Sequence, residues 1–286
     1  MHRQQVGILH PGEMGISVAA TIQNSGHTVH WVSQGRSPQT HTRAEKYGLN
    51  DARSLSRLCE TCSILVSVCP PAEAEAIAKD VLAHNFAGIY VDMNAISPQR
   101  AKRIGQSMAD AGATFVDGGI IGGPAWTLGN TRLYLAGEAA EQVTSCFSAG
   151  PLEAVIIGEV IGKASALKMC YAAYTKGTTA LLTAVLATAE ALDVRAELEG
   201  QWSHEPSDLV TSAAHRVRQV TAKAWRFVGE MDEIAATFEE VGTPNDFHRA
   251  AAEIYRRLAN FKNAPEMPTL EDVLQAVLHD TLESTS

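Results

Sequence analysis

The chain has 286 residues, of which 45% are hydrophobic and 19% charged, a composition typical of globular proteins and unlike that of disordered chains. Its 23 Lys and Arg against 32 Asp and Glu give a net charge of −9, which argues against a nucleic-acid partner. The longest low-charge stretch, 177–189, is too short to span a membrane, and the N-terminus lacks a signal-peptide pattern. The sequence therefore predicts a cytoplasmic protein with no membrane partner.

The first half of the chain alternates short apolar runs with amphipathic segments. Helices are predicted at 14–25 and 72–84. Strands, rich in Val, Ile and aromatic residues, are predicted at 5–9, 28–32, 64–68, 88–93, 114–118 and 132–137. This alternation is typical of an α/β fold with a doubly wound (Rossmann) sheet.

The second half reads as helical throughout. Residues 163–194 contain no proline, are rich in Ala and Leu, and predict one long interdomain helix with Gly177 as its weak point. Breaks are expected where Pro, Gly and Asn gather; Pro206 and Ser207 should open one helix and Thr269 should cap the last. The outline is a cofactor-binding domain over 1–160 and an all-helical domain over 161–286.

A glycine loop follows the first predicted strand. Gly12 and Gly15 occupy the positions that let a backbone approach a pyrophosphate and let the helix pack closely on the sheet, whereas His10 stands where the first glycine is usual. The predicted cofactor contacts in this loop are His10, Pro11, Gly12, Glu13 and Met14. The alternative is a tight turn that binds nothing.

The end of the second predicted strand indicates which cofactor enters. NAD sites usually place a carboxylate about 20 residues after the loop, but none lies between Glu13 and Glu45. Ser33, Arg36 and Ser37 stand there instead, and an arginine can form a bidentate pair with a 2′-phosphate. The cofactor is therefore predicted to be NADP, with NAD less favoured, unless Arg36 is simply a solvated loop residue.

Two further strand ends carry candidate contacts. Asn94 ends a predicted strand, where ligands bind in open α/β sheets, and is a candidate cofactor contact. The glycine-rich segment 117–123 exposes backbone N–H groups that suit a carboxylate, a phosphate or a nicotinamide amide, or else it is a loop that needs room. Cys59 and Cys62 have no second ligand pair, so no metal is expected.

Several stretches together resemble the β-hydroxyacid dehydrogenase family, the relatives of 6-phosphogluconate dehydrogenase, in a little-characterised branch. They are Met14-Gly15, Gly26-His27-Thr28-Val29, Pro70-Pro71, "DGGIIGG" at 117–123 and Lys168. The resemblance implies that Lys168 is the catalytic acid or base and that the helical domain forms a homodimer. It also implies cofactor contacts at Cys69 and Pro70, and small-molecule substrate contacts at Gly119, Ile120, Ile121 and Gly122. Thr175 lies seven residues after Lys168, on the same helix face, and is a further candidate substrate contact.

The sequence departs from this family where polar anchors are usual. Ile121 replaces a serine, and Tyr171 or Ala172 stands where an asparagine is typical. On a helix Tyr171 shares a face with Lys168 and could bind the substrate or relay a proton. Burial would lower the pKa of Lys168, although a surface lysine with a packed stem is the alternative.

Farther along the chain, 216–238 is amphipathic, and its apolar face is predicted to be core or dimer interface. Arg226 and Glu230 lie four residues apart on it and are predicted to form a solvated ion pair, or else to complete the pocket of a partner subunit.

The favoured function is an NADP-dependent oxidoreductase that transfers a hydride between the nicotinamide and a small hydroxy or keto compound. Two alternatives stay open. Ile121 favours an imine reductase, although that group usually replaces the lysine, and the lost polar anchors favour a non-catalytic NADP-binding regulator.

Overall fold

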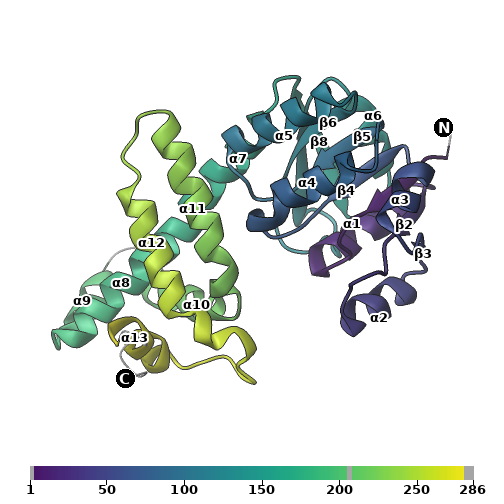
Figure 1. Cartoon of the computed structure of the whole chain (residues 1–286). Helices are drawn as coiled ribbons and strands as arrows, with labels where there is room; N and C mark the ends of the chain where they lie inside the picture. Colours follow the sequence, from purple (N-terminus) through teal and green to yellow (C-terminus); the bar gives the residue numbers. More distant parts are fainter. Residues whose placement is uncertain (1–2, 205–207, 280–286) are drawn as a thin grey trace, which may run out of the picture. The chain divides into compact units, whose positions relative to one another are not determined.

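The computed structural model describes residues 3–204 and 208–279 (Figure 1). The chain divides into two compact units, Met1–Met169 and Cys170–Ser286, so the division falls later than the predicted domain boundary at 160. Among the described residues, no helix combines the length and the apolar character that crossing a membrane requires.

The first unit is built on one eight-stranded sheet with the order β3-β2-β1-β4-β5-β6-β7-β8. The strands from β3 to β6 in this order are parallel, β7 is antiparallel to β6, and β8 is parallel to β7. This confirms the predicted doubly wound fold. The bounds are β1 Gln5–Ile8, β2 Thr28–Trp31, β3 Asn50–Asp51, β4 Ile64–Ser67, β5 Ile89–Asp92, β6 Thr114–Ile121, β7 Thr131–Ala136 and β8 Leu152–Gly158.

Two strands were missed from the sequence, β3 and β8. The first has only two residues, too few to show a period. β8 lies at the sheet edge with Ile156 45% exposed, and its apolar run over 154–157 is only four residues long, without the alternation of a half-buried strand. β6 is longer than predicted because Gly119, Ile120 and Ile121 continue the ladder with β7.

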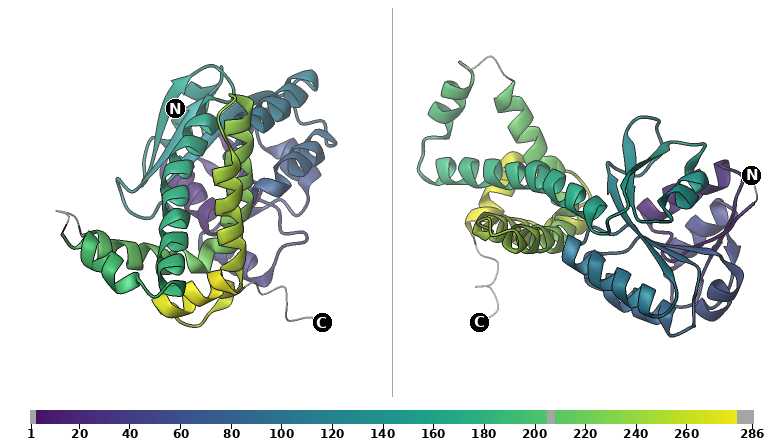
Figure 2. Two further views of the ribbon diagram at one scale, coloured as in Figure 1. Left: turned by 90° about the vertical axis from the view of Figure 1, so that its left-hand side faces the viewer. Right: turned by 90° about the horizontal axis from the view of Figure 1, so that it is seen from above.

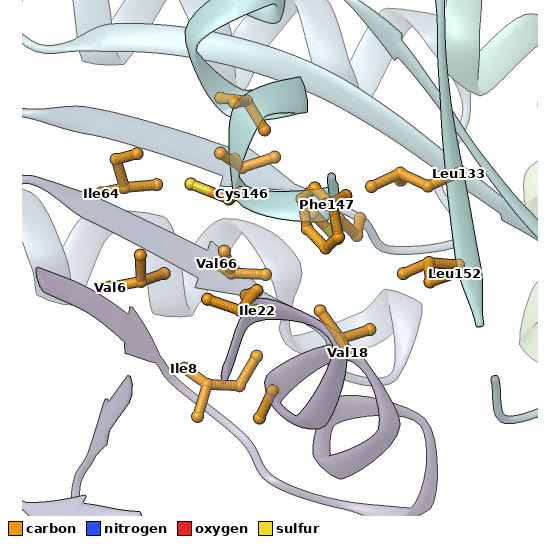
Figure 3. Packing of buried hydrophobic residues seen from close by; sticks show 14 of the residues in the cluster. Val6, Ile8, Val18, Ile22, Ile64, Val66, Leu133, Cys146, Phe147 and Leu152 are labelled. Atoms are coloured by element: carbon orange, nitrogen blue, oxygen red, sulfur yellow. The ribbon is translucent and has the colours of Figure 1, made fainter. Parts of the chain in front are cut away.

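Helices cover both faces of the sheet. On one face α1 (Glu13–Asn24) turns Val18 and Ile22 toward a cluster that includes Ile8 and Phe147 (Figure 3). α2 (Pro38–Lys46) and α6 (Ala140–Thr144) contribute Ala44, Ala140 and Val143 to the same cluster. The other face buries residues of α3 (Leu55–Thr61), α4 (Ala74–Leu82) and α5 (Pro98–Asp110). The helices predicted at 14–25 and 72–84 are thereby confirmed.

The second unit is helical, as predicted, and is the part coloured green to yellow in Figure 2. The predicted long helix is present as α7 (Lys163–Ala172), a π-helical turn (Ala173–Gly177) and α8 (Thr178–Ala191). The rest is α9 Arg195–Trp202, α10 Leu209–Gln219, α11 Ala224–Glu240, α12 Asp246–Arg257 and α13 Leu270–Leu278, with α11 and α12 side by side (Figure 1). The helix start predicted at Pro206 and Ser207 lies outside the described residues.

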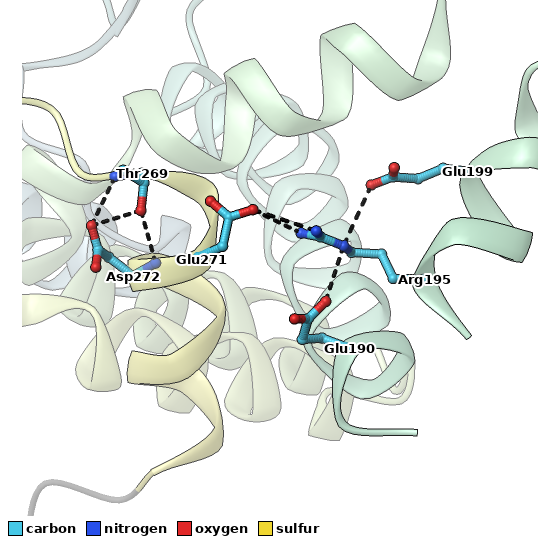
Figure 4. Close-up of polar contacts among 6 residues, drawn as sticks. All are labelled: Glu190, Arg195, Glu199, Thr269, Glu271 and Asp272. Carbon is cyan, nitrogen blue, oxygen red and sulfur yellow. Dashed lines mark hydrogen bonds and ion pairs between the residues drawn. The ribbon is translucent and has the colours of Figure 1, made fainter. Parts of the chain in front are cut away.

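Polar contacts fix the last helix (Figure 4). Thr269 caps α13 as predicted, and its hydroxyl accepts from the Asp272 N–H while the Asp272 carboxylate accepts from the Thr269 N–H. Arg195 at the start of α9 pairs with Glu190 and with Glu271 of α13. The capping box satisfies orphan donors of the helix, and the arginine links α13 to the end of α8.

Candidate dinucleotide and substrate site

The glycine loop lies at the carboxyl end of β1 and opens α1. A Cβ on Gly15 would lie 2.1 Å from the His10 carbonyl oxygen, so the loop can close this tightly only with glycine there. A Cβ on Gly12, by contrast, would meet no atom within 4 Å. Gly12 is the N-cap of α1 and has no side chain to satisfy its first N–H groups, an arrangement that binds phosphate. These residues fit a dinucleotide pyrophosphate.

The other predicted loop contacts differ in exposure. Pro11 is buried, Met14 is half-buried and Glu13 is exposed. His10 is half-buried, and burial, followed by the charge of Arg36, lowers its pKa to about 4. The imidazole of His10 is therefore neutral at physiological pH and does not oppose the cation beside it.

Arg36 folds back onto this loop. Its guanidinium donates to the carbonyl oxygen of Leu9 at 3.1 Å, and partial burial lowers its pKa. Ser37 is exposed and caps α2 by accepting from the Thr40 N–H at 3.3 Å. Arg36 is thus held near the first turn of the loop, which argues against the alternative of a solvated loop residue.

A carboxylate that was not predicted from the sequence lies at the end of β2, beside Ser33. Asp51, at the end of β3, accepts from the backbone N–H of Ser33 at 3.2 Å and from that of Arg53 at 2.7 Å. Desolvation acts to raise the pKa of Asp51, but the hydrogen bonds from Ser33 and Arg53 outweigh it and hold this pKa below its ordinary value. The sequence has no carboxylate between Glu13 and Glu45, but the pairing of Trp31 with Asp51 brings the Asp51 carboxylate to the end of β2.

The predicted contacts after β4 and β5 form one buried network. Asn94 accepts from the Cys69 N–H at 2.5 Å and donates to Ser67 Oγ at 3.1 Å and to Asp92 Oδ2 at 3.0 Å. Both amide hydrogens of Asn94 thus have protein partners, so its side chain ties the two loops together. Pro70 lies exposed beside Cys69.

Asp92 anchors this network and is 1% exposed. Its carboxylate also accepts from the backbone N–H of Asn94 at 2.9 Å. Burial, reinforced by the nearby charge of Asp117, raises the pKa of Asp92 to about 7.

The glycine-rich segment 117–123 is largely strand. Gly119 and Ile120 are buried in β6, opposite Tyr134 and Leu133 of β7, while Ile121 is half-buried at the strand end and Gly122 is exposed with φ of 124°. A Cβ on Gly119 would lie 2.7 Å from the Ala164 carbonyl oxygen. The room that this glycine leaves is therefore filled by α7.

Lys168 takes part in the same contact between β6 and α7. Its Cβ lies 3.2 Å from where a Cβ on Gly119 would be, and the lysine is half-buried. Side chains of a strand alternate between faces, so Gly119 and Ile121 share the face that α7 covers. The structure thus brings Lys168 to the segment that the resemblance links to the substrate.

Tyr171 and Thr175 follow on the second unit. The Tyr171 side chain is 47% exposed, and the hydroxyl of Thr175 donates to the Tyr171 carbonyl oxygen at 3.1 Å. Thr175 lies in the π-helical turn, a feature found often at functional sites. Its hydroxyl is occupied by a backbone acceptor in the same helix.

The prediction that Arg226 and Glu230 form a solvated ion pair is wrong, because Glu230 is largely shielded from solvent. Glu230 has a side chain only 16% exposed and pairs with Lys176 Nζ at 2.8 Å, while Arg226 lies over the ring of Trp225. Because α11 packs on the π-helical turn, Glu230 meets Lys176 there. Of the apolar face predicted there, Met231 and Ile234 are fully buried.

Comparisons with known proteins agree with this geometry. Residues 5–149 match the NAD binding domain of 6-phosphogluconate dehydrogenase, and residues 189–258 match a domain of unknown function, DUF1932. The chain is 28% identical over 205 residues to an uncharacterized 28.5 kDa protein of Methanothermus fervidus, covering 69% of this chain and 78% of that protein. It is 26% identical over 141 residues to a 3-hydroxyisobutyrate dehydrogenase of Pseudomonas aeruginosa, covering 48% of this chain and 47% of that enzyme, about half its length.

Solved structures extend the likeness over the whole chain. A conserved protein of unknown function, reported to resemble 3-hydroxyacid dehydrogenases, is 28% identical, with a TM-score of 0.68 over 90% of this chain and 97% of its own. A 3-hydroxyisobutyrate dehydrogenase of Mycobacterium tuberculosis (17% identical, TM-score 0.70, 97% and 100% covered) shares the fold. So does an imine reductase of Myxococcus stipitatus (18% identical, TM-score 0.57, 97% and 100% covered).

The family match spans the whole of the sheet up to β7, including the glycine loop and the strand ends that carry the predicted contacts. The first unit is an NAD(P)-binding domain of the hydroxyacid dehydrogenase type. The chain therefore belongs to the family of the NAD binding domain of 6-phosphogluconate dehydrogenase.

Proposed function

We propose that the protein is an NADP-dependent oxidoreductase that interconverts a small hydroxy compound and the corresponding keto compound, with Lys168 as the acid or base. The observation that carries the proposal is the contact between Lys168 and Gly119 in the unit that holds the glycine loop. Lys168 of α7 thereby lies against β6 of the sheet whose first strand carries the glycine loop, as a proton-transfer group beside a dinucleotide site would.

The chemistry divides between cofactor and chain. The nicotinamide, when bound, supplies or takes the hydride. Lys168 gives a proton to the carbonyl oxygen in reduction and removes it from the hydroxyl in oxidation. The first turn of α1 holds the pyrophosphate, and Gly12 leaves room for its approach.

The preference for NADP rests on Arg36. Its guanidinium lies at the loop beside His10, which is neutral and does not repel it. A phosphate is expected to draw this arginine into a charge-assisted pair. Asp51 opposes the preference because its carboxylate lies at Ser33. The prediction is that Arg36 outweighs Asp51, since arginine binds phosphate bidentately.

A thermal-shift comparison tests the cofactor. NADP should raise Tm more than NAD at equal concentration, and Arg36→Ala should remove the difference, whereas Arg43→Ala should retain it because Arg43 binds the Pro11 carbonyl oxygen instead. Equal shifts with wild type would overturn the preference for NADP.

A matched pair of lysine variants tests the acid or base. Lys163 lies exposed on α7, so Lys163→Ala is the control for Lys168→Ala. Lys168→Ala should lower kcat by roughly 100-fold to 10,000-fold while cofactor affinity is retained. Unchanged turnover in Lys168→Ala would remove this lysine from the chemistry.

A second candidate function is the reduction of an imine, favoured by the apolar side chain of Ile121 at the end of β6. Turnover of a panel of 3-hydroxy acids, ketones and cyclic imines distinguishes the two functions. An imine reductase would oxidise NADPH with the imines and not with the ketones, whereas a hydroxy-compound dehydrogenase would act on the hydroxy acids or the ketones. Cofactor binding without turnover over the whole panel would favour the non-catalytic regulator.

A homodimer through the helical unit is also part of the proposal. Tyr174 is 72% exposed and Leu181 47% exposed about two turns apart on the long helix, and a dimer interface would cover both side chains. Light scattering should give twice the mass of the chain for wild type and a lower mass for Leu181→Glu.

A further inference from the structure

The carboxylate of Asp117, in β6, caps the N-terminus of α7, which follows β6 by more than 40 residues in the chain. The side chain of Asp117 is 1% exposed. Its Oδ2 accepts from the backbone N–H groups of Gly162, Ala164 and Ser165 at 2.9, 2.9 and 3.1 Å, and its Oδ1 accepts from the Ser165 hydroxyl at 2.6 Å. One buried carboxylate therefore takes four donors from the start of α7.

These bonds complete the first turn of α7. The first N–H groups of a helix lack intrahelical acceptors and need partners from elsewhere. The Lys163 N–H donates to the Val160 carbonyl oxygen, and the next two N–H groups go to Asp117. The first intrahelical bond follows, from Ala166 to Gly162. The helix thus begins at a place that the sheet determines.

The same helix reaches Lys168 one turn later. Ser165 and Lys168 are three residues apart and lie on one face of α7. Asp117 and Gly119 are two residues apart and lie on one face of β6. Asp117 holds the helix at Ser165, and Gly119 lets it approach at Lys168. Two points of attachment set both the rotation of α7 and its distance from the strand.

The neighbouring strand carries a matching anchor. Asp92 of β5 pairs in register with Asp117, and it holds the loop at Cys69 through Asn94. The predicted cofactor loop and the helix of Lys168 are thus attached to adjacent buried carboxylates. Other charged side chains near the pair include Arg100, whose charge acts on Asp92.

We propose that Asp117 is a positioning residue for Lys168: by capping α7 from within β6, it fixes where the lysine stands over Gly119 and the end of β6. This inference rests on the proposed role of Lys168 as acid or base. A shift of about 1 Å in a reacting group can lower a rate on the order of 100-fold, so a cap of this kind affects the rate without touching substrate.

The test uses the full chain with NADPH and four variants. Asp117→Ala removes the cap, Asp117→Asn keeps an acceptor for the N–H groups, and Ser165→Ala removes only the shortest bond. Thr237→Ala is the matched control, because it deletes a buried hydroxyl that bonds the Glu233 carbonyl oxygen within α11. Ser165→Ala keeps the test decisive if Asp117→Ala fails to fold.

Three quantities are measured on each variant. They are the deuterium exchange of the amides at 162–166, the rate at which trinitrobenzenesulfonate labels Lys168 as a function of pH, and the dissociation constant of NADPH. Where wild type turns over a member of the substrate panel, kcat and KM are added. The labelling profile reports the surroundings of Lys168 without any need for a known substrate.

Asp117→Ala should speed exchange at 162–166 roughly tenfold and shift the labelling profile of Lys168, with NADPH affinity within about twofold of wild type. Its kcat should fall on the order of 100-fold at an unchanged KM. Asp117→Asn should recover most of each change, Ser165→Ala should show the same changes to a smaller extent, and Thr237→Ala should show none.

Faster exchange in Asp117→Ala with an unchanged labelling profile and unchanged kcat would overturn the positioning role, because the cap would then stabilise the helix alone. Failure of the proposed function gives a different result. In that case Lys168→Ala turns over as wild type does, while Asp117→Ala still alters the labelling of Lys168.

Discussion

The carboxylate of Asp51 accepts a hydrogen bond from the backbone N–H of Ser33, at the position where a dinucleotide-binding sheet usually carries the carboxylate of its second strand. In this protein the carboxylate comes from β3, which pairs with β2 through only two residues. In the proposed site, Arg36 and Asp51 would therefore act on the same end of the cofactor with opposite charge.

Asp51→Asn should shift the preference further toward NADP. The amide oxygen can still accept from Ser33, but the negative charge that repels a 2′-phosphate is removed. We expect the ratio of NADP to NAD affinity to rise about fivefold, measured by titration at fixed ionic strength. Glu141→Gln, an exposed change on α6, is the control. An unaltered ratio in Asp51→Asn would mean that Asp51 does not act on the ribose.

Gly12→Ala and Gly15→Ala should separate binding from folding. A Cβ at Gly12 meets no protein atom within 4 Å, and the φ of −69° suits alanine, so the free energy of unfolding should change by less than about 0.5 kcal/mol. Cofactor affinity should nevertheless fall on the order of tenfold, because the methyl group occupies the approach of the pyrophosphate.

Gly15→Ala should lower both quantities, since its Cβ would lie 2.1 Å from the His10 carbonyl oxygen and the loop must move. Urea unfolding and cofactor titration measure the two effects. If Gly12→Ala bound NADP as wild type does, the open space at Gly12 would not be the cofactor path.

Gly119→Ala should displace α7 from β6. The new Cβ would lie 2.7 Å from the Ala164 carbonyl oxygen and 3.2 Å from the Lys168 Cβ, and neither backbone nor Cβ can rotate away. The free energy of unfolding should fall by about 1–3 kcal/mol, and kcat should fall more than tenfold. Gly200→Ala in α9 meets no atom within 4 Å and serves as the control. Normal kcat in Gly119→Ala would show that the spacing of helix and strand is not critical.

Asp92→Asn should change how stability depends on pH. Burial raises the pKa of Asp92 to about 7, so the folded state keeps a proton that the unfolded state releases near pH 4. The contribution of Asp92 to stability is thus full below pH 4, is lost as the pH rises to about 7, and is constant above that. Asparagine carries no such dependence.

The unfolding free energy of Asp92→Asn relative to wild type should therefore rise with pH, by up to roughly 1.4 kcal/mol per unit between pH 4 and 7, above a constant offset for the lost acceptor. Denaturant unfolding at several pH values measures it, with the exposed Asp110→Asn as control. Parallel curves for Asp92→Asn and wild type would contradict the raised pKa.

Much of the fold could be predicted because its signals are local. Short apolar runs bounded by turns identified the strands from β1 to β7 other than β3, and the absence of proline identified the long helix. β8 was missed although 154–157 are consecutive apolar residues, because so short a run shows no alternation that would mark it as a strand. The π-helical turn ends at Gly177, the residue that the sequence marked as the weak point of the helix.

The candidate site could be predicted where the local backbone conformation requires a particular residue type. Gly12 and Gly15 followed from the spacing of a strand, a turn and a helix. The sequence did not indicate that the open side of Gly119 faces α7, and the predicted substrate contact of Gly119 stays a prediction. The side-chain amide of Asn94 donates to Ser67 and Asp92, which the sequence did not indicate, and the cofactor contact of Asn94 stays a prediction.

The sequence by itself determined the alternation of strands and helices in the first unit, the helical character of the second, the glycine turn and the resemblance to the family, since each depends on residues close together in the chain. The tertiary structure alone decided that Asp51 reaches Ser33, that Asp117 caps α7, and that Lys168 stands over Gly119. Strand register and helix packing join residues that lie 18 to 49 positions apart in these contacts, and no local pattern carries that information.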